Sequence, residues 1–153
     1  MGLTDLVYPG ANHTRFNHAL GAMHLMSLAL DTLKNKGHKI NQKEYEAAIL
    51  AVLLHDVGHG PFSHVLEKYI LDEVNHEFIS ILIMEKLNEQ FNGKLDLCIK
   101  IFKNEYDRPF FHQLVSGQMD MDRMDYLNRD CFYTGVDEGT IGGDRIIKML
   151  NLV

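Results

Sequence analysis

The segment from Arg15 to about Lys36 constrains the fold most, because apolar residues occupy nearly the whole circumference of the helix that it would form. A helix that is apolar on all sides is typical of the interior of a larger bundle. Thr14 has the side chain of a helix N-cap, and Gly37 is the residue type that commonly ends a helix. The pattern therefore predicts a buried first helix within a fold of several helices.

The rest of the sequence predicts further helices and no sheet. A second helix is expected over residues 42–56, where Asn41 and Glu44 resemble a capping box. Apolar alternation is too weak to support a strand, and no internal repeat is visible. Residues 1–14 and 104–109 are expected to be irregular. The other expected helices cover residues 62–72, 76–91, 94–104, 110–117, 120–132 and 143–151. We therefore predict an all-α, compact multi-helix bundle.

Length and composition fit a single domain, residues 1–153, because 46% of the residues are hydrophobic and can form a sizeable core. The formal net charge of -6 argues against nucleic acid as the main ligand, since such binding depends on clustered Lys and Arg. The sequence shows no secretory signal pattern, and no apolar run approaches the roughly 20 residues that span a bilayer. We therefore expect a cytoplasmic protein with no membrane partner.

The stretch from His55 to His64 carries an adjacent His-Asp pair, His55 and Asp56, followed by His59 and His64. Imidazole nitrogens and carboxylate oxygens are ligands that divalent transition metals accept, and nearby histidines can move protons. The alternative for the pair is a hydrogen-bonded helix C-terminus. This concentration of histidines points to metal-assisted chemistry.

Residues 120–130 place four carboxylates and two arginines within little more than three helical turns. At about 100° per residue, Asp122, Tyr126 and Asp130 fall along one stripe of this helix, with Arg123 at its edge. The stripe offers a carboxylate ligand, a phenolic donor and a cation. Taken alone, the acidic helix could equally be a solvated face.

Other polar residues are expected to be structural. Asp125 and Arg129 are four residues apart on a neighbouring face, where an ordinary surface ion pair is expected. The remaining histidines are scattered singly along the chain, and we expect a structural or surface role for them. They are His13, His24, His38 and His112.

Two histidines and two carboxylates could together form one metal site. They are His18, on the first turn of the first helix, with His55, Asp56 and Asp122. This mixed ligand set suits one divalent ion of Mn, Fe, Co, Ni or Zn, and also Mg if fewer nitrogens take part. It leaves coordination positions open for water or a phosphate oxygen.

Further side chains could take part in the chemistry around such a metal. His59, His64, and His76 with Glu77 are candidates for protonating a leaving oxygen or orienting the nucleophile. Arg15, at the start of the first helix, can approach a phosphate alongside the amide groups of the helix terminus.

Four motifs resemble, in their order and spacing, the HD superfamily of metal-dependent phosphohydrolases, and specifically its deoxynucleoside triphosphate triphosphohydrolase branch. The motifs are PGANHTRFNH at 9–18, LHDVGHGPFSH at 54–64, His76-Glu77, and MDMDRMDYLNRDCFYTG at 119–135. They span most of the chain. One departure is Asn17, which stands where the family usually carries Glu before the ligand histidine.

The resemblance implies a role for each matching residue. His18, His55, Asp56 and Asp122 match the metal ligands of the family. His59, His64 and His76 match histidines beside the triphosphate, with His64 similar to the proposed proton donor. Arg15, Arg123, Tyr126 and Asp130 match positions that contact phosphate or sugar. The implied reaction converts a deoxynucleoside triphosphate (dNTP) and water to a deoxynucleoside and intact triphosphate.

Alternatives remain open at this point. Family members are considerably longer at both ends, so the chain is expected to be a core that lacks their N- and C-terminal parts. It could act as another nucleotide phosphatase or phosphodiesterase of the HD class, or as a non-catalytic nucleotide-binding or assembly module. A homo-oligomer is also open, because relatives commonly assemble.

Overall fold

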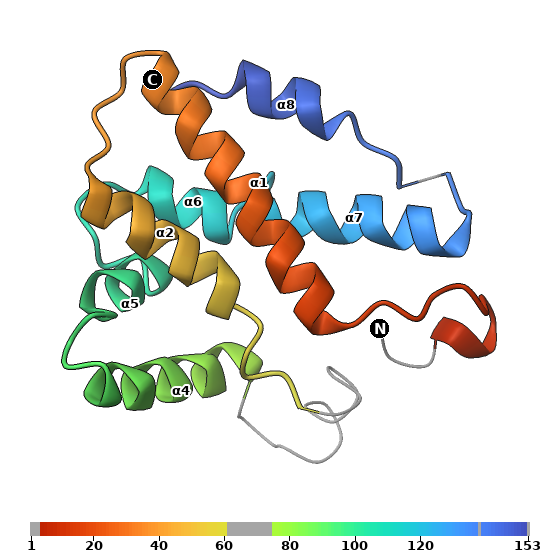
Figure 1. Ribbon diagram of the computed structural model, residues 1–153, viewed down its shortest axis with the longest axis horizontal. Helices are drawn as coiled ribbons and strands as arrows, with labels where there is room; N and C mark the ends of the chain where they lie inside the picture. Colours follow the sequence, from red (N-terminus) through yellow and green to blue (C-terminus); the bar gives the residue numbers. More distant parts are fainter. Residues whose placement is uncertain (1–3, 61–74, 138, 153) are drawn as a thin grey trace.

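Helices account for all regular structure in the residues that this computed structural model describes, which are 4–60, 75–137 and 139–152 (Figure 1). The elements are η1 (Thr4–Leu6), α1 (Arg15–Asn35), α2 (Gln42–Leu54), α4 (His76–Gln90), α5 (Asp96–Phe102), α6 (Phe110–Val115), α7 (Met121–Thr134) and α8 (Gly143–Met149). The prediction of an all-α bundle is confirmed. None of the described helices is both long enough and apolar enough to cross a membrane.

The observed helices agree with the predicted ones to within a few residues. The second helix is the informative case, because it ends at Leu54 and leaves His55 and Asp56 in the turn that follows. The predicted helix over 62–72 lies outside the described residues.

Helices α1 and α2 begin with reciprocal side-chain caps. Thr14 Oγ1 accepts a hydrogen bond from the Asn17 amide, and the Thr14 amide donates to Asn17 Oδ1 at 3.0 Å. Asn41 and Glu44 form the same arrangement at the start of α2, as the sequence predicted. Asn17, the residue that departs from the motifs noted above, therefore forms part of the N-terminal cap of α1.

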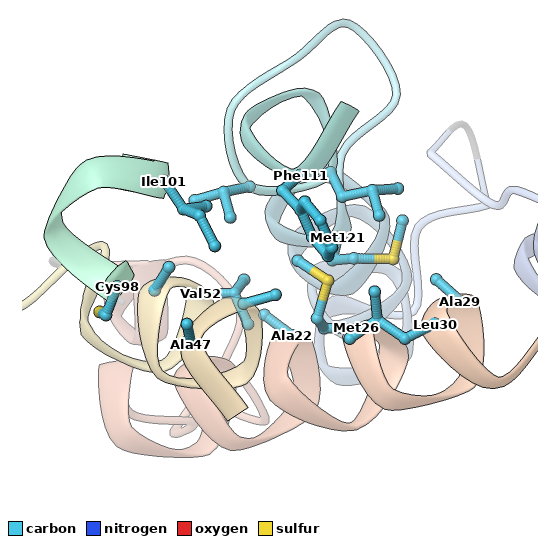
Figure 2. Packing of buried hydrophobic residues seen from close by; sticks show 14 of the residues in the cluster. Ala22, Met26, Ala29, Leu30, Ala47, Val52, Cys98, Ile101, Phe111 and Met121 are labelled. Atoms are coloured by element: carbon cyan, nitrogen blue, oxygen red, sulfur yellow. The ribbon is translucent and has the colours of Figure 1, made fainter. Parts of the chain in front are cut away.

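Helix α1 crosses the middle of the protein, with α2 packed on one side and α7 on the other (Figure 1). Figure 2 shows the core between these helices and the shorter α5 and α6. Its most deeply buried residues include Ala22, Met26, Ala29, Leu30, Val52, Ile101, Phe111, Met121 and Met124. Alanines on α1 and α2 let the helix backbones approach closely, and the larger side chains fill the remaining space. The expectation that α1 lies within a helical bundle agrees with its packing against α2 and α7, but the expectation that it is buried on nearly all sides was wrong. Phe16, Leu20 and Leu28 of α1 are exposed, at 68%, 37% and 37%.

The turn after α2 is held against the start of α4. The Gly58 amide donates to Ser80 Oγ at 2.9 Å, and Ser80 Oγ donates to the His55 carbonyl at 2.9 Å. A Cβ atom at position 58 would lie 2.2 Å from the His76 carbonyl oxygen, so only glycine permits this approach. The contact brings His76 beside the His55-Asp56 turn.

A buried carboxylate joins α2 to the loop after α5. Glu44 Oε1 accepts hydrogen bonds from Arg108 Nη1 at 2.6 Å and from the Tyr106 hydroxyl at 2.8 Å, while Oε2 accepts from the Asn41 amide at 2.9 Å. Glu44 is only 4% exposed. Because all three donors reach it, the buried charge is compensated.

Stability is expected to fall in acid as Glu44 becomes protonated. Burial raises the pKa of Glu44, but its hydrogen bonds from Asn41, Arg108 and Tyr106 outweigh burial and lower it below 4.5. A carboxyl whose pKa is depressed by folding stabilises the protein above its unfolded-state pKa, and this stabilisation is lost as the pH falls through the folded-state pKa. Glu44→Gln should lower the free energy of unfolding at neutral pH by about 1–3 kcal/mol.

Urea unfolding of both proteins across acidic and neutral pH measures this effect. The Glu44→Gln variant should lose less stability than the wild type between about pH 5 and about pH 3. Glu46→Gln is the matched control, since Glu46 lies exposed on the same helix. An acid profile of Glu44→Gln that matches the wild type would contradict the assignment.

Candidate metal centre

The four residues predicted as metal ligands come from three parts of the fold and meet at one point. His18 lies in the first turn of α1, Asp122 lies in the first turn of α7, and His55 and Asp56 lie in the turn after α2. Asp122 Oδ1 is 2.9 Å from His18 Nε2 and 3.4 Å from His55 Nε2. Asp56 Oδ2 is 3.9 Å from His18 Nε2. The ligand atoms of His18, His55 and Asp56 all lie within 4.8 Å of one another.

Both imidazoles direct Nε2 toward this point, because Nδ1 is used elsewhere. His55 Nδ1 donates to the Val52 carbonyl, and His18 Nδ1 donates to Asp125 Oδ2. The buried His55 Nε2 has no hydrogen-bond partner within the described residues. Carboxylate oxygens of Asp56 and Asp122 lie 3.4 Å from it without hydrogen-bond geometry, so the nitrogen is available to a ligand. This nitrogen and the two-imidazole, two-carboxylate set fit a divalent transition metal.

The site is strongly polarised. Burial raises the pKa of Asp56, but the imidazoles of His59 and His55 outweigh it and lower this pKa to about 2. Burial likewise raises the pKa of Asp122, but His18 and His55 outweigh it and hold it well below its usual range. Both carboxyl groups are therefore ionised at neutral pH.

The pKa values of the two histidines are shifted in the opposite direction. Burial lowers the pKa of His18, but Asp122 and Asp125 outweigh this effect and raise it to about 9. Burial lowers the pKa of His55, and the nearby carboxylates of Asp122 and Asp56 reverse this and raise it. A nitrogen must be deprotonated to bind a metal, so metal binding at this site would release protons.

A second carboxylate lies behind His18. Asp125 Oδ2 is 2.7 Å from His18 Nδ1, and Arg129 donates to both Asp125 oxygens at 2.8 Å. The ion pair of Asp125 with Arg129 forms, but the prediction that it lies on the surface was wrong, since Asp125 is 7% exposed. The missed signal was the spacing: Asp125 is three positions after Asp122, and residues three apart lie on the same side of a helix. The pair fixes the orientation and tautomer of His18.

Gly21 allows this carboxylate to reach α1. A Cβ atom at position 21 would lie 1.8 Å from Asp125 Oδ1 and 2.3 Å from Arg129 Nη2. Gly21 is three residues after His18 and therefore lies one turn further along the same face of α1. A larger residue would displace the group that holds His18.

Asp56 also belongs to a second cluster. Its Oδ2 accepts a hydrogen bond from Arg15 Nη1 at 2.6 Å, and its Oδ1 is 3.4 Å from His59 Nε2. The His59 and His76 rings are stacked, with centroids 3.8 Å apart. The ligand atoms of Asp56, His59 and His76 lie within 4.8 Å of one another, so this group could also hold a cation. His64 lies outside the described residues.

A cavity of about 200 Å³ opens beside the predicted ligands. The residues that line it come from the turn after α2, from α4 to α6, and from α7. They are His55, Asp56, His76, Glu77, Phe102, His112, Val115, Ser116 and Asp122. His112 was expected to have only a structural or surface role, and no motif in the sequence indicates its place in the cavity lining.

Three of the predicted substrate contacts lie apart from this cavity. Arg123 is exposed and its Nη1 donates to the Gln118 carbonyl at 3.2 Å. Asp130 Oδ1 lies 2.8 Å from His13 Nε2. Among the described residues that line the cavity, neither these two nor the half-buried Tyr126 is present. Arg15 is the predicted contact that the structure does bring to the site, through its bond to Asp56.

Fold and geometry together define an α-helical protein whose helix ends gather two imidazoles and two carboxylates beside a polar cavity. Residues 15–130 match the family model described as the HD domain. The match covers more than half of the chain, and the chain belongs to the HD-domain family. The resemblance inferred from the four motifs is thereby confirmed.

Several relatives resemble nearly the whole chain. The crystal structure of a phosphohydrolase from Bacteroides thetaiotaomicron has a TM-score of 0.95 and 60% identity, over 99% of this chain and 38% of that one. The uncharacterized protein YwfO of Bacillus subtilis is 36% identical over 98% of this chain and 36% of its own length. The deoxynucleoside triphosphate triphosphohydrolase SAMHD1 homolog of Dictyostelium discoideum is 30% identical over 88% of this chain and 30% of its own length. This chain therefore spans 30% to 38% of the length of these relatives.

Replacing Gly21 with Ala is expected to destabilise the protein by about 1–3 kcal/mol, because the added Cβ overpacks the contact with Asp125. Helix propensity alone predicts the opposite sign, a stabilisation of about 1 kcal/mol. Urea unfolding measures the change, and a more stable Gly21→Ala variant would contradict the packing argument.

Replacing Asp125 with Asn is expected to weaken metal binding by about 10- to 100-fold, because Asn keeps the size of the side chain but not the charge that holds His18. Titration calorimetry with Mn²⁺ measures the affinity. Asp144→Asn, on the exposed side of α8, is the matched control and should bind like the wild type. Equal affinity in the two variants would show that Asp125 has only a packing role.

Proposed function

We propose that this chain forms the metal-binding core of a metal-dependent phosphohydrolase that acts on nucleotides. The observation that carries the proposal is the convergence of His18, His55, Asp56 and Asp122 at the edge of a polar cavity. The chain has no packing need for two ionised carboxylates and an unpaired buried imidazole nitrogen in one place. Such a group is the donor set of a divalent-metal site.

One divalent ion would be held by these four residues, and Mn, Fe, Co, Ni, Zn and Mg are all compatible with the donors. When bound, it would lower the pKa of a water molecule and offset the charge of a phosphoryl group. Asp125 supports this site by orienting the His18 ring, so that Nε2 remains available as the ligand atom.

The remaining residues near the cavity would bind and protonate the substrate. Arg15 is one-third exposed and lies against Asp56, where it can donate to a phosphate oxygen. The stacked His59 and His76, with the neighbouring Glu77, would transfer protons and orient the nucleophile; the stacking and the place of His76 and Glu77 in the cavity lining support this. His64 is our proposed proton donor to the leaving oxygen.

The substrate class proposed is a dNTP, hydrolysed to the deoxynucleoside and intact triphosphate. Two lines support it, the four motifs of the chain and the 30% identity to a relative that is named a deoxynucleoside triphosphate triphosphohydrolase. Arg123, Tyr126 and Asp130 do not line the cavity, and in this proposal they contact phosphate or sugar where the substrate extends beyond it. A cytoplasmic location and a homo-oligomeric state are part of the same proposal.

Product identification tests the proposal. The purified protein, loaded with each candidate metal in turn, is incubated with the four dNTPs, and the products are separated by ion-exchange chromatography. Inorganic triphosphate and deoxynucleoside are expected. Release of orthophosphate or nucleoside monophosphate would contradict the triphosphohydrolase reaction and favour another phosphatase or phosphodiesterase activity.

Asp122→Asn should lower both metal affinity and the rate of hydrolysis by more than ~100-fold. Loss of a residue that only hydrogen-bonds to a metal ligand costs up to about 100-fold, and Asp122 is a predicted ligand itself. Asp144→Asn is again the control. Nucleotide binding without hydrolysis in any metal-loaded form would indicate a binding module instead.

A further inference from the structure

We propose that His112 is a further active-site residue, whose Nε2 accepts a hydrogen bond from an O–H group bound in the cavity. The O–H group belongs either to the attacking water or to a hydroxyl of the substrate sugar. This inference rests on the proposed function and adds a residue that none of the four motifs contains. His112 lies on α6, an element that carries none of the predicted metal ligands, and it lines the same cavity as three of them.

The position of His112 is the first observation. Its side chain lines the same 200 Å³ cavity as His55, Asp56 and Asp122. The preceding residue, Phe111, is fully buried in the core and anchors α6. A ring held on a packed helix is kept in place before any ligand arrives, which is what a binding residue requires.

The hydrogen bond of His112 fixes its tautomer. Nδ1 lies 3.1 Å from the Ile101 carbonyl oxygen, and a carbonyl oxygen can only accept. Nδ1 therefore carries the proton, and in the neutral ring Nε2 has the lone pair. Within residues 4–60, 75–137 and 139–152, no group forms a hydrogen bond with this Nε2.

The lone pair selects the chemistry of the ligand. A phosphate oxygen without a proton would not bind to a neutral imidazole nitrogen that can only accept, whereas an O–H donor would. Phe102 and Val115, which also line the cavity, are apolar, whereas Ser116, four residues after His112, adds a hydroxyl that can donate or accept there. His112 is thus suited to orient a hydroxyl or a water molecule next to the ionised carboxylates.

Two substitutions separate this role from a purely structural one. His112→Asn keeps a donor near the Nδ1 position, and so the bond to Ile101, but removes Nε2. His112→Gln keeps a polar atom near the Nε2 position but loses the Nδ1 donor. The steady-state hydrolysis of dGTP, the affinity for Mn²⁺ and the melting temperature are measured for both variants and the wild type.

We expect His112→Asn to lose about tenfold or more in kcat/KM, while its Mn²⁺ affinity and melting temperature stay close to those of the wild type. His112→Gln should retain more activity. The inference is overturned if His112→Asn is as active as the wild type, or if Gln is the more damaging change in both activity and melting temperature. That second result would assign His112 to the Ile101 contact alone.

The same assay with dideoxy-GTP, which lacks the 3′-hydroxyl, identifies the O–H donor. If the sugar hydroxyl is the donor, the penalty of His112→Asn disappears with dideoxy-GTP. If the attacking water is the donor, the penalty persists. Either pattern supports the inference and assigns the bond.

Failure of the proposed function would be recognised separately. If the wild type hydrolyses no nucleotide, the phosphohydrolase proposal fails, and His112 is then judged from calorimetric binding of dGTP in the presence of Ca²⁺. Weaker binding to His112→Asn than to the wild type would still support the inference. Equal binding, or no binding to either, would overturn it.

Discussion

The imidazole of His18, held between two carboxylates of α7, is the interaction on which the rest of the site depends. Its Nε2 lies 2.9 Å from Asp122 Oδ1, and its Nδ1 lies 2.7 Å from Asp125 Oδ2. Hydrogen bonds to charged groups contribute about 1.5–3 kcal/mol, and both of these are shielded from water because His18 is 1% exposed. They fix where α1 crosses α7 and place one predicted ligand from each helix side by side.

A second contact completes the site from the other side of the bundle. Ser80 of α4 bonds both to the Gly58 amide and to the His55 carbonyl, so the turn after α2 is held by a helix that follows it in the chain. The predicted metal ligands lie in the first turns of α1 and α7 and in the turn after α2, so side chains of different elements converge there. The apolar core lies behind them, between α1, α2, α5, α6 and α7 (Figure 2). The apolar residues of the core are thus distinct from the predicted metal ligands, and the polar group is available for a metal and a substrate.

Much of the fold could be predicted because its signals are local. The apolar circumference of α1, the caps at Thr14 and Asn41, and the stop at Gly37 each act within a few residues. The boundary of α2 was harder, since the helix was predicted to continue to Asp56 but ends at Leu54, and the turn that follows is held by the long-range bond between Gly58 and Ser80. The predicted ligands converge as expected, whereas Arg123 and Asp130 bond to neighbouring groups away from the cavity.

The sequence by itself determined the helical class of this protein, the order of its helices and the four residues most suited to bind a metal, because periodicity, capping and ligand chemistry are written in short stretches of residues. Only the tertiary structure shows where Asp125, Gly21 and His112 lie relative to the predicted metal ligands. Each of these positions depends on elements far apart in the chain: the packing of α7 against α1 for the first two, and the cavity that α6 shares with the turn after α2 for the third. The spacing of Asp125 from Asp122 was a local signal, but no local pattern indicates the surroundings of Gly21 or His112, since burial is set by packing at a distance.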